Sequence, residues 1–83
     1  MSAGHLRPDL LAVLCEEFAL ELDSLSAATT LDALGLDSLA LTIARDALEQ
    51  RLGLTLPDGL LFETRTLGDL SAAIERLEER SAA

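Results

Sequence analysis

Near the middle of this 83-residue chain stands the stretch Gly35-Leu36-Asp37-Ser38-Leu39. Gly35 can adopt a positive φ at little cost and so end a turn, and Asp37 is of a residue type that caps helices. Ser38 then opens a helix, with its hydroxyl at the positive end of the helix dipole. Since the first backbone N–H groups of a helix lack intrahelical partners, an anionic phosphate is favoured beside Ser38.

Three longer segments have apolar residues at helical spacing. The first begins at Pro8, which suits the first turn of a helix, and the second runs from Ser38 to Leu52. The third starts near Thr66. Their apolar positions are Leu11, Leu14, Cys15, Phe18 and Leu22 in the first, Leu41, Ala44, Leu48 and Leu52 in the second, and Leu67, Leu70, Ala73, Ile74 and Leu77 in the third.

The connections between these segments complete the prediction. Residues 23–36 form a long connection, in which Thr29 to Leu34 suggest a brief helical turn closed by Gly35. Gly59 to Thr64 can hold one short helix. The predicted fold is therefore all-α, a small irregular four-helix bundle of three longer helices and one short helix. We expect one domain over residues 1–83, with an ordered core from about residue 8 to 80 and flexible termini.

Composition supports packed helices. The chain is 49% hydrophobic but only 2% aromatic. Leu and Ala are good helix formers, whereas the residues typical of strands are scarce. We therefore expect a core of Leu and Ala built around Phe18 and Phe62.

The charge balance limits the partners. Six basic residues, none of them lysine, stand against 15 acidic ones, a net charge of −9. Nucleic acid and anionic membranes are poor partners for such a chain, since phosphate backbones are bound by Lys and Arg. A protein partner with a basic docking face fits better, although the acidity also fits a role in solubility alone.

Other classes of protein are disfavoured by what the sequence lacks. A single cysteine, Cys15, excludes an internal disulfide and a cysteine cluster for zinc, so we expect no metal site. No apolar run approaches the ~20 residues that cross a membrane. The N-terminus has no hydrophobic signal region, and we expect a cytoplasmic protein.

The whole pattern resembles the carrier-protein superfamily, the acyl carrier proteins and their peptidyl relatives. The resemblance covers nearly the whole chain and rests on Gly35 to Leu39, the helix through Leu52, Leu56-Pro57-Asp58, and Thr66-Leu67-Gly68-Asp69-Leu70. The stretch Asp37-Ser38-Leu39-Ala40-Leu41 is most similar to the discrete carriers of bacterial polyketide assembly.

The resemblance implies a carrier and not an enzyme. Ser38 would receive a covalent 4′-phosphopantetheine arm from coenzyme A, transferred by a separate phosphopantetheinyl transferase. The terminal thiol of the arm would hold acyl groups as thioesters. Asp37 would cap the helix and also help the transferase to position its metal and the phosphate. A catalytic serine needs an adjacent base, and the one histidine, His5, lies in the N-terminal segment.

The family analogy and the helical wheel also predict a docking face for partner enzymes. These partners would be acyltransferases or ketosynthase-type enzymes with basic docking faces, and the carrier itself would be a monomer. The predicted docking residues are Leu36, Leu39, Thr42, Ile43, Asp46, Leu61 and Phe62.

Departures from the family pattern bear on the pathway. Fatty-acid carriers usually have acids where this chain has Ala40 and Ile43, and Arg45 adds a positive charge. A dedicated pathway partner is therefore favoured over general fatty-acid enzymes. A peptidyl or fatty-acid carrier remains an alternative, as does an acidic helical docking module without a covalent arm. The small side chains of Ala44 and Ala47 could admit an acyl chain between the helices, or the cargo could stay outside.

Overall fold

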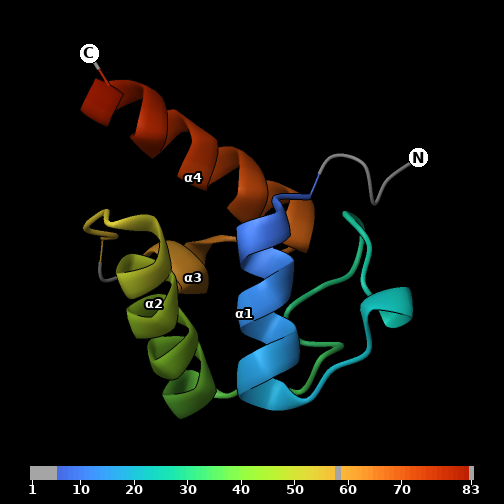
Figure 1. The fold of residues 1–83 in the computed structure, drawn as a ribbon. Helices are drawn as coiled ribbons and strands as arrows, with labels where there is room; N and C mark the ends of the chain where they lie inside the picture. Colours follow the sequence, from blue (N-terminus) through green and yellow to red (C-terminus); the bar gives the residue numbers. More distant parts are fainter. Residues whose placement is uncertain (1–5, 58, 83) are drawn as a thin grey trace.

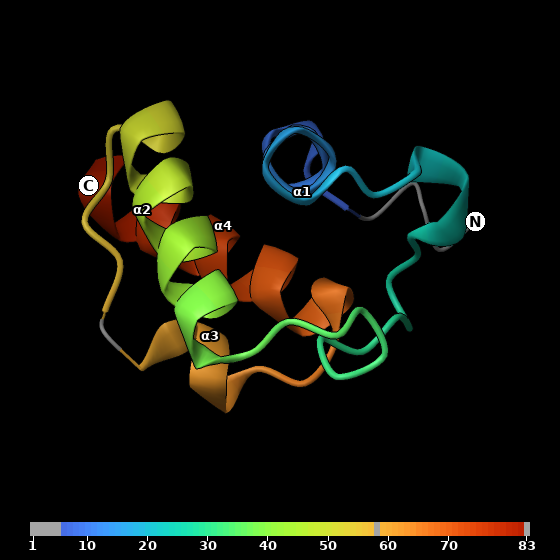
Figure 2. The ribbon, with the colours of Figure 1, turned by 90° about the horizontal axis from the view of Figure 1, so that it is seen from below.

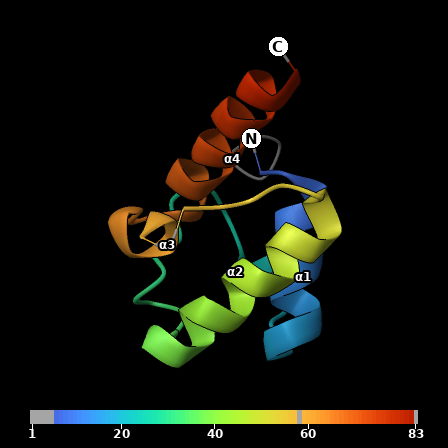
Figure 3. The ribbon, with the colours of Figure 1, turned by 90° about the vertical axis from the view of Figure 1, so that its left-hand side faces the viewer.

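The computed structural model describes residues 6–57 and 59–82. Its elements, in chain order, are α1 (Pro8–Phe18), the 3-10 helix η2 (Leu22–Ser24), α2 (Ser38–Leu52), α3 (Leu60–Glu63) and α4 (Leu67–Ala82). α1 and α2 lie side by side and run in opposite directions, and α4 lies across the end at which α1 begins (Figures 1 and 3). The predicted all-α fold, with three longer helices and one short one, is confirmed.

Leucines from every segment meet between the helices. α1, α2 and α4 each contribute three buried apolar side chains, and the connections and α3 supply the others. The buried apolar residues are Leu6, Leu10, Val13, Leu14, Leu25, Leu31, Leu41, Ala44, Leu48, Leu56, Leu61, Leu67, Leu70 and Ile74. The long connection contributes Leu25 and Leu31. Their burial fixes the conformation of residues 19–37, although this segment contains no long helix.

Our prediction that both phenylalanines organise the core was wrong. The side chain of Phe62 is 55% exposed, and Phe18 is only half-buried. α3 is one turn long and directs Leu61 into the core, so the next residue, about 100° further round the helix, points outward. The centre is therefore filled mainly by leucine, together with Val13, Ala44 and Ile74.

The predicted apolar face of the first helix extends too far. α1 ends at Phe18 because Ala19 takes a left-handed conformation, with φ 55°, which breaks the helical spacing. Leu22 consequently belongs to η2 and is 57% exposed, instead of buried as we predicted.

Residues just before α1 pack against the rest of the molecule. Leu6 is 6% exposed, and the amide of Arg7 donates to Ser71 Oγ on α4 at 3.1 Å. The Arg7 guanidinium donates to both carboxylate oxygens of Glu78, at 2.5 and 2.8 Å, and to Asp9 at 3.1 Å. Burial by itself lowers the pKa of Arg7, but the hydrogen bonds to Glu78 and Asp9 and the charges of both carboxylates leave that pKa raised. Arg7 thereby joins the start of α1 to α4.

Backbone hydrogen bonds attach the long connection to the start of α4. Leu31 donates its amide to the carbonyl of Arg65 at 3.0 Å, and Leu67 donates to the carbonyl of Thr29 at 2.9 Å. These bonds form one short antiparallel bridge in an otherwise helical molecule, as far as residues 6–57 and 59–82 are concerned. Segments far apart in the sequence are thus held side by side, as Figure 2 shows.

The contact with the long connection also supplies acceptors for the first amides of α4. Gly68 donates its amide to the carbonyl of Ala27 at 2.9 Å. A Cβ at Gly68 would lie 3.0 Å from that oxygen, so only glycine permits the approach without a shift. Thr66 and Asp69 complete the cap by exchanging side chain–backbone hydrogen bonds, a capping box.

The segment after α2 is held by the polar face of that helix. α2 ends at Gly53, which has φ 69°. Further along, Leu56 donates its amide to Glu49 Oε2 at 2.8 Å and accepts from Arg45 Nε at 3.2 Å. This pair of contacts directs the Leu56 side chain, 1% exposed, into the core.

Some predictions concern positions that lie outside the described residues: the N-terminal segment up to His5, Asp58 and Ala83. At the other end, α4 extends to Ala82. Among the helices of the described chain, none is long and apolar enough to cross a membrane.

Replacing Arg7 with Gln tests the link between α1 and α4. We expect the free energy of unfolding in urea to fall by about 1–3 kcal/mol, because Glu78 loses a paired, charge-assisted partner. Arg51→Gln is the matched control, since it breaks an exposed 3.3 Å ion pair with Glu16. The control should lose no more than about 0.5 kcal/mol. Equal losses in the two variants would contradict the role given to Arg7.

Candidate functional site

The chain approaches α2 through a tight turn. Leu34 donates its amide to the carbonyl of Leu31, and Gly35 donates to that of Asp32 at 3.0 Å. Gly35 has φ 73°, and a Cβ there would meet no atom within 4 Å. Glycine is therefore favoured here by backbone conformation and not by lack of space. The predicted turn closed by Gly35 is confirmed.

Asp37 caps α2 as predicted. Its backbone is extended, with φ −85° and ψ −176°, and its carboxylate Oδ1 accepts from the amide of Ala40 at 2.8 Å. Its carbonyl accepts from the amide of Leu41 at 2.9 Å, which starts the helical ladder. The cap fixes where α2 begins, and so which residue comes first in the helix.

Ser38 is that first residue and it is exposed. Within residues 6–57 and 59–82, the amides of Ser38 and Leu39 have no acceptor, whereas the next two amides bond to Asp37. The Ser38 hydroxyl therefore lies beside two unpartnered N–H groups and the positive end of a 15-residue helix. A phosphate esterified to this hydroxyl would meet a favourable potential.

Large apolar side chains are exposed next to Ser38. Leu39 is 69% exposed and Ile43, one helical turn further on, is 41% exposed. Thr42 and Asp46 are exposed on the same helix, and α3 adds Phe62. We call Leu39, Thr42, Ile43, Asp46 and Phe62 the α2–α3 surface.

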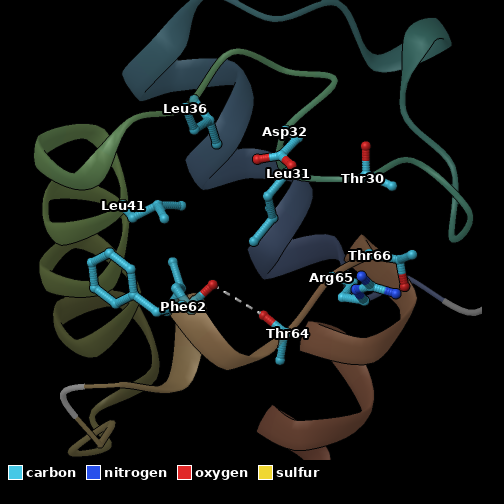
Figure 4. Close-up of a pocket in the computed structure, with 10 residues that line it drawn as sticks. Thr30, Leu31, Asp32, Leu36, Leu41, Phe62, Thr64, Arg65 and Thr66 are labelled. Carbon is cyan, nitrogen blue, oxygen red and sulfur yellow. Dashed lines mark hydrogen bonds between the residues drawn. The ribbon is translucent and has the colours of Figure 1, made fainter.

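The other predicted docking residues are placed differently. Leu61 is 3% exposed, because α3 turns it into the core, so it does not contribute to the exposed surface. Leu36 is half-buried and packs against the core. Both line a cavity of about 510 Å³ between the connection before α2, α2 itself and α3 (Figure 4).

This cavity has an apolar half and a polar half. Leu36 and Leu41, on either side of Ser38 in the sequence, lie toward Phe62, while Asp32 and Arg65 lie on the opposite side (Figure 4). The apolar lining is Leu31, Leu36, Leu41, Leu61 and Phe62, and the polar lining is Thr30, Asp32, Thr64, Arg65 and Thr66.

Sequence reasoning missed this cavity and considered only the small side chains of Ala44 and Ala47 as a way in for an acyl chain. Ala44, which we considered as part of an entry for an acyl chain, is 1% exposed and packed in the core. The cavity is lined by residues from three separate segments: the connection before α2, α2 itself, and residues 61–66. No periodic pattern marks such a set, although the polar Thr64-Arg65-Thr66 run before α4 was a visible signal.

Asp37→Ala tests the cap. Losing the side-chain acceptor for Ala40 should lower the free energy of unfolding by about 1 kcal/mol, measured by urea or thermal unfolding. Asp37→Asn keeps an oxygen acceptor and should stay close to the parent. If Asp37→Ala were as stable as the parent, the cap would contribute nothing to α2.

Comparison with known proteins agrees with this geometry. The phosphopantetheine attachment site family matches residues 8–74, a range that includes α1, α2, α3 and the start of α4. The chain is 37% identical over 72 residues to acyl carrier protein MbtL of Mycolicibacterium paratuberculosis, covering 86% of this chain and 81% of that protein. It is 36% identical over 74 residues to acyl carrier protein MbtL of Mycobacterium tuberculosis, covering 88% of each. Family match, identity and fold agree, and the chain belongs to the phosphopantetheine-binding carrier family as an acyl carrier protein.

Proposed function

We propose that Ser38 is the residue to which the 4′-phosphopantetheine of this carrier is attached. The supporting observation is an exposed hydroxyl on the first residue of α2, beside two unpartnered amides. In the transfer, the Ser38 oxygen bonds to the phosphorus of the coenzyme A diphosphate that carries pantetheine. The bond from that phosphorus to the oxygen of the nucleotide phosphate breaks, and adenosine 3′,5′-bisphosphate leaves. The hydroxyl proton passes to the transferase.

The chain itself contributes position and electrostatics to this step. Asp37 holds the start of α2 through its hydrogen bond to Ala40, so the Ser38 hydroxyl has a defined direction. The free amides and the helix dipole favour the phosphodiester that results. The exposed carboxylate edge of Asp37 is available to the metal of the transferase. In this proposal the chain is a substrate and carrier without catalytic activity of its own.

The bound arm supplies a thiol that holds acyl groups as thioesters. The relatives named above are acyl carrier proteins, and we propose an acyl or polyketide intermediate as the cargo here as well. Ala40 and Ile43, at positions where fatty-acid carriers usually have acids, favour a dedicated biosynthetic partner. A peptidyl or fatty-acid carrier, loaded by a different enzyme, is the alternative within the family.

We also propose that the α2–α3 surface is where partner enzymes dock. Its apolar side chains adjoin Ser38, so a partner that covers them also reaches the arm. Asp46 lies among them, 3.7 Å from Arg45, and offers a charge to a basic partner face. The transferase is the partner that the carrier must meet first.

Intact-protein mass tests the attachment site. Incubation with coenzyme A, magnesium and a promiscuous phosphopantetheinyl transferase should add one phosphopantetheine to the parent and none to Ser38→Ala. Circular dichroism should show equal helicity, because Ser38 is exposed. Addition to the Ser38→Ala variant would overturn the assignment. No addition to the folded parent, even with its native transferase, would favour a docking module without an arm.

The same transferase tests the docking surface. Leu39→Ala removes apolar surface that the transferase would cover. We expect the kcat/KM of the transferase for this variant to fall roughly fivefold, which corresponds to about 1 kcal/mol of lost apolar burial. Asp46→Arg should change the salt dependence of the rate. Leu22→Ala is the matched control, since Leu22 is similarly exposed but lies on η2. A control as slow as Leu39→Ala, or no effect in any variant, would contradict the proposed surface.

A further inference from the structure

Besides the cavity near Ser38, the molecule has a groove between residues 57–60 and the second half of α4. It has a volume of about 520 Å³. Its apolar lining is Pro57, Leu60, Ala73 and Leu77, and its charged lining is Arg76, Glu79 and Arg80. Leu60, Ala73 and Leu77 are each partly buried, so they present apolar surface to the groove while remaining packed below. The attachment site and the α2–α3 surface use none of these residues.

The charged lining of this groove has a positive balance, since two arginines stand against one carboxylate. Arg7, Arg45 and Arg51 each pair with a carboxylate. In the described part of the chain, Arg76 and Arg80 pair with none, although Glu79 also lines the groove. Two unpaired guanidinium groups therefore stand together on a chain with a net charge of −9.

The spacing of these arginines fits a helical ligand. Arg76 and Arg80 lie one turn apart on the same face of α4, so carboxylates one turn apart on a partner helix can meet both. Apolar residues on the adjoining face of that helix would enter between Leu60 and Leu77. Helix-in-groove recognition uses this combination of apolar anchors and flanking charges.

The position of the groove makes simultaneous use possible. Figure 1 shows the second half of α4 at one end of the molecule and the start of α2, with Ser38, at the other. A segment bound in the groove would leave Ser38 and the α2–α3 surface open. It would also raise the effective concentration of any enzyme to which it is linked.

We propose that the groove between α3 and α4 docks an amphipathic, acidic helical segment of a partner protein. The inference does not depend on the attachment of an arm to Ser38. It assigns the carrier a tethering site whose charge preference is opposite to that expected of the α2–α3 surface.

An NMR titration of the full-length, ¹⁵N-labelled chain tests this. The probe is a designed helical peptide with Leu along one face and pairs of Glu one turn apart beside it. We expect the amide signals of Leu60, Ala73 and Leu77 to shift while that of Ser38 does not. The double variant Arg76→Gln/Arg80→Gln should weaken binding roughly fivefold to tenfold, since two charge contacts are lost. The matched double variant Arg51→Gln/Arg65→Gln, with the same net charge, should stay close to the parent.

Several outcomes would overturn the proposal. These are equal binding of a peptide with Gln in place of Glu, equal weakening by both double variants, and shifts confined to the α2–α3 surface. Shifts at the groove that appear without peptide as the chain is concentrated would assign the groove to a second copy instead. The Arg76→Gln/Arg80→Gln variant should be loaded with phosphopantetheine as fast as the parent, which would separate the groove from the attachment of the arm.

Discussion

The hydrogen bonds between the long connection and the start of α4 are the constraint on which the site depends. Ala27 and Thr29 accept the first amides of α4, and Leu31 returns a bond to Arg65. These hydrogen bonds fix the long connection against α4, and Leu31 is thereby buried in the core. The turn that follows can then deliver Gly35 and Asp37 to a single place, where α2 begins. Gly68 favours this arrangement, because a Cβ there would lie 3.0 Å from the Ala27 carbonyl oxygen and the contact would have to shift.

The same arrangement divides the molecule chemically. One end presents the start of α2, with a hydroxyl, free amides and exposed apolar side chains. The other end presents arginines beside an apolar groove. Because a carrier must be recognised by several enzymes in turn, surfaces of unlike charge allow different partners to be distinguished. The net charge of −9 is a sum over the whole chain and does not give the local charge at either end.

Local signals predicted the secondary structure well. Asp37 and Gly53 mark the two ends of α2, and both act through the backbone of their own neighbours, so no distant contact is needed to interpret them. Errors arose where apolar spacing was the only guide. The spacing of Leu22 continues the apolar face of α1, yet Ala19 ends the helix and leaves Leu22 exposed. Leu6 and Arg7 lack any helical pattern, but α4 buries the first and pairs with the second.

The sequence by itself therefore determined the helices, the cap at Asp37, the exposed Ser38 and the resemblance to carriers, because these follow from residues close together in the chain. Helical spacing also predicted much of the core, including Leu41, Ala44 and Leu48. Only the tertiary structure decided the exceptions: it turned Leu61 inward and Phe62 outward, and it formed the cavity and the groove from separate segments. The physical reason is that burial depends on which surfaces meet, and periodicity describes one helix at a time.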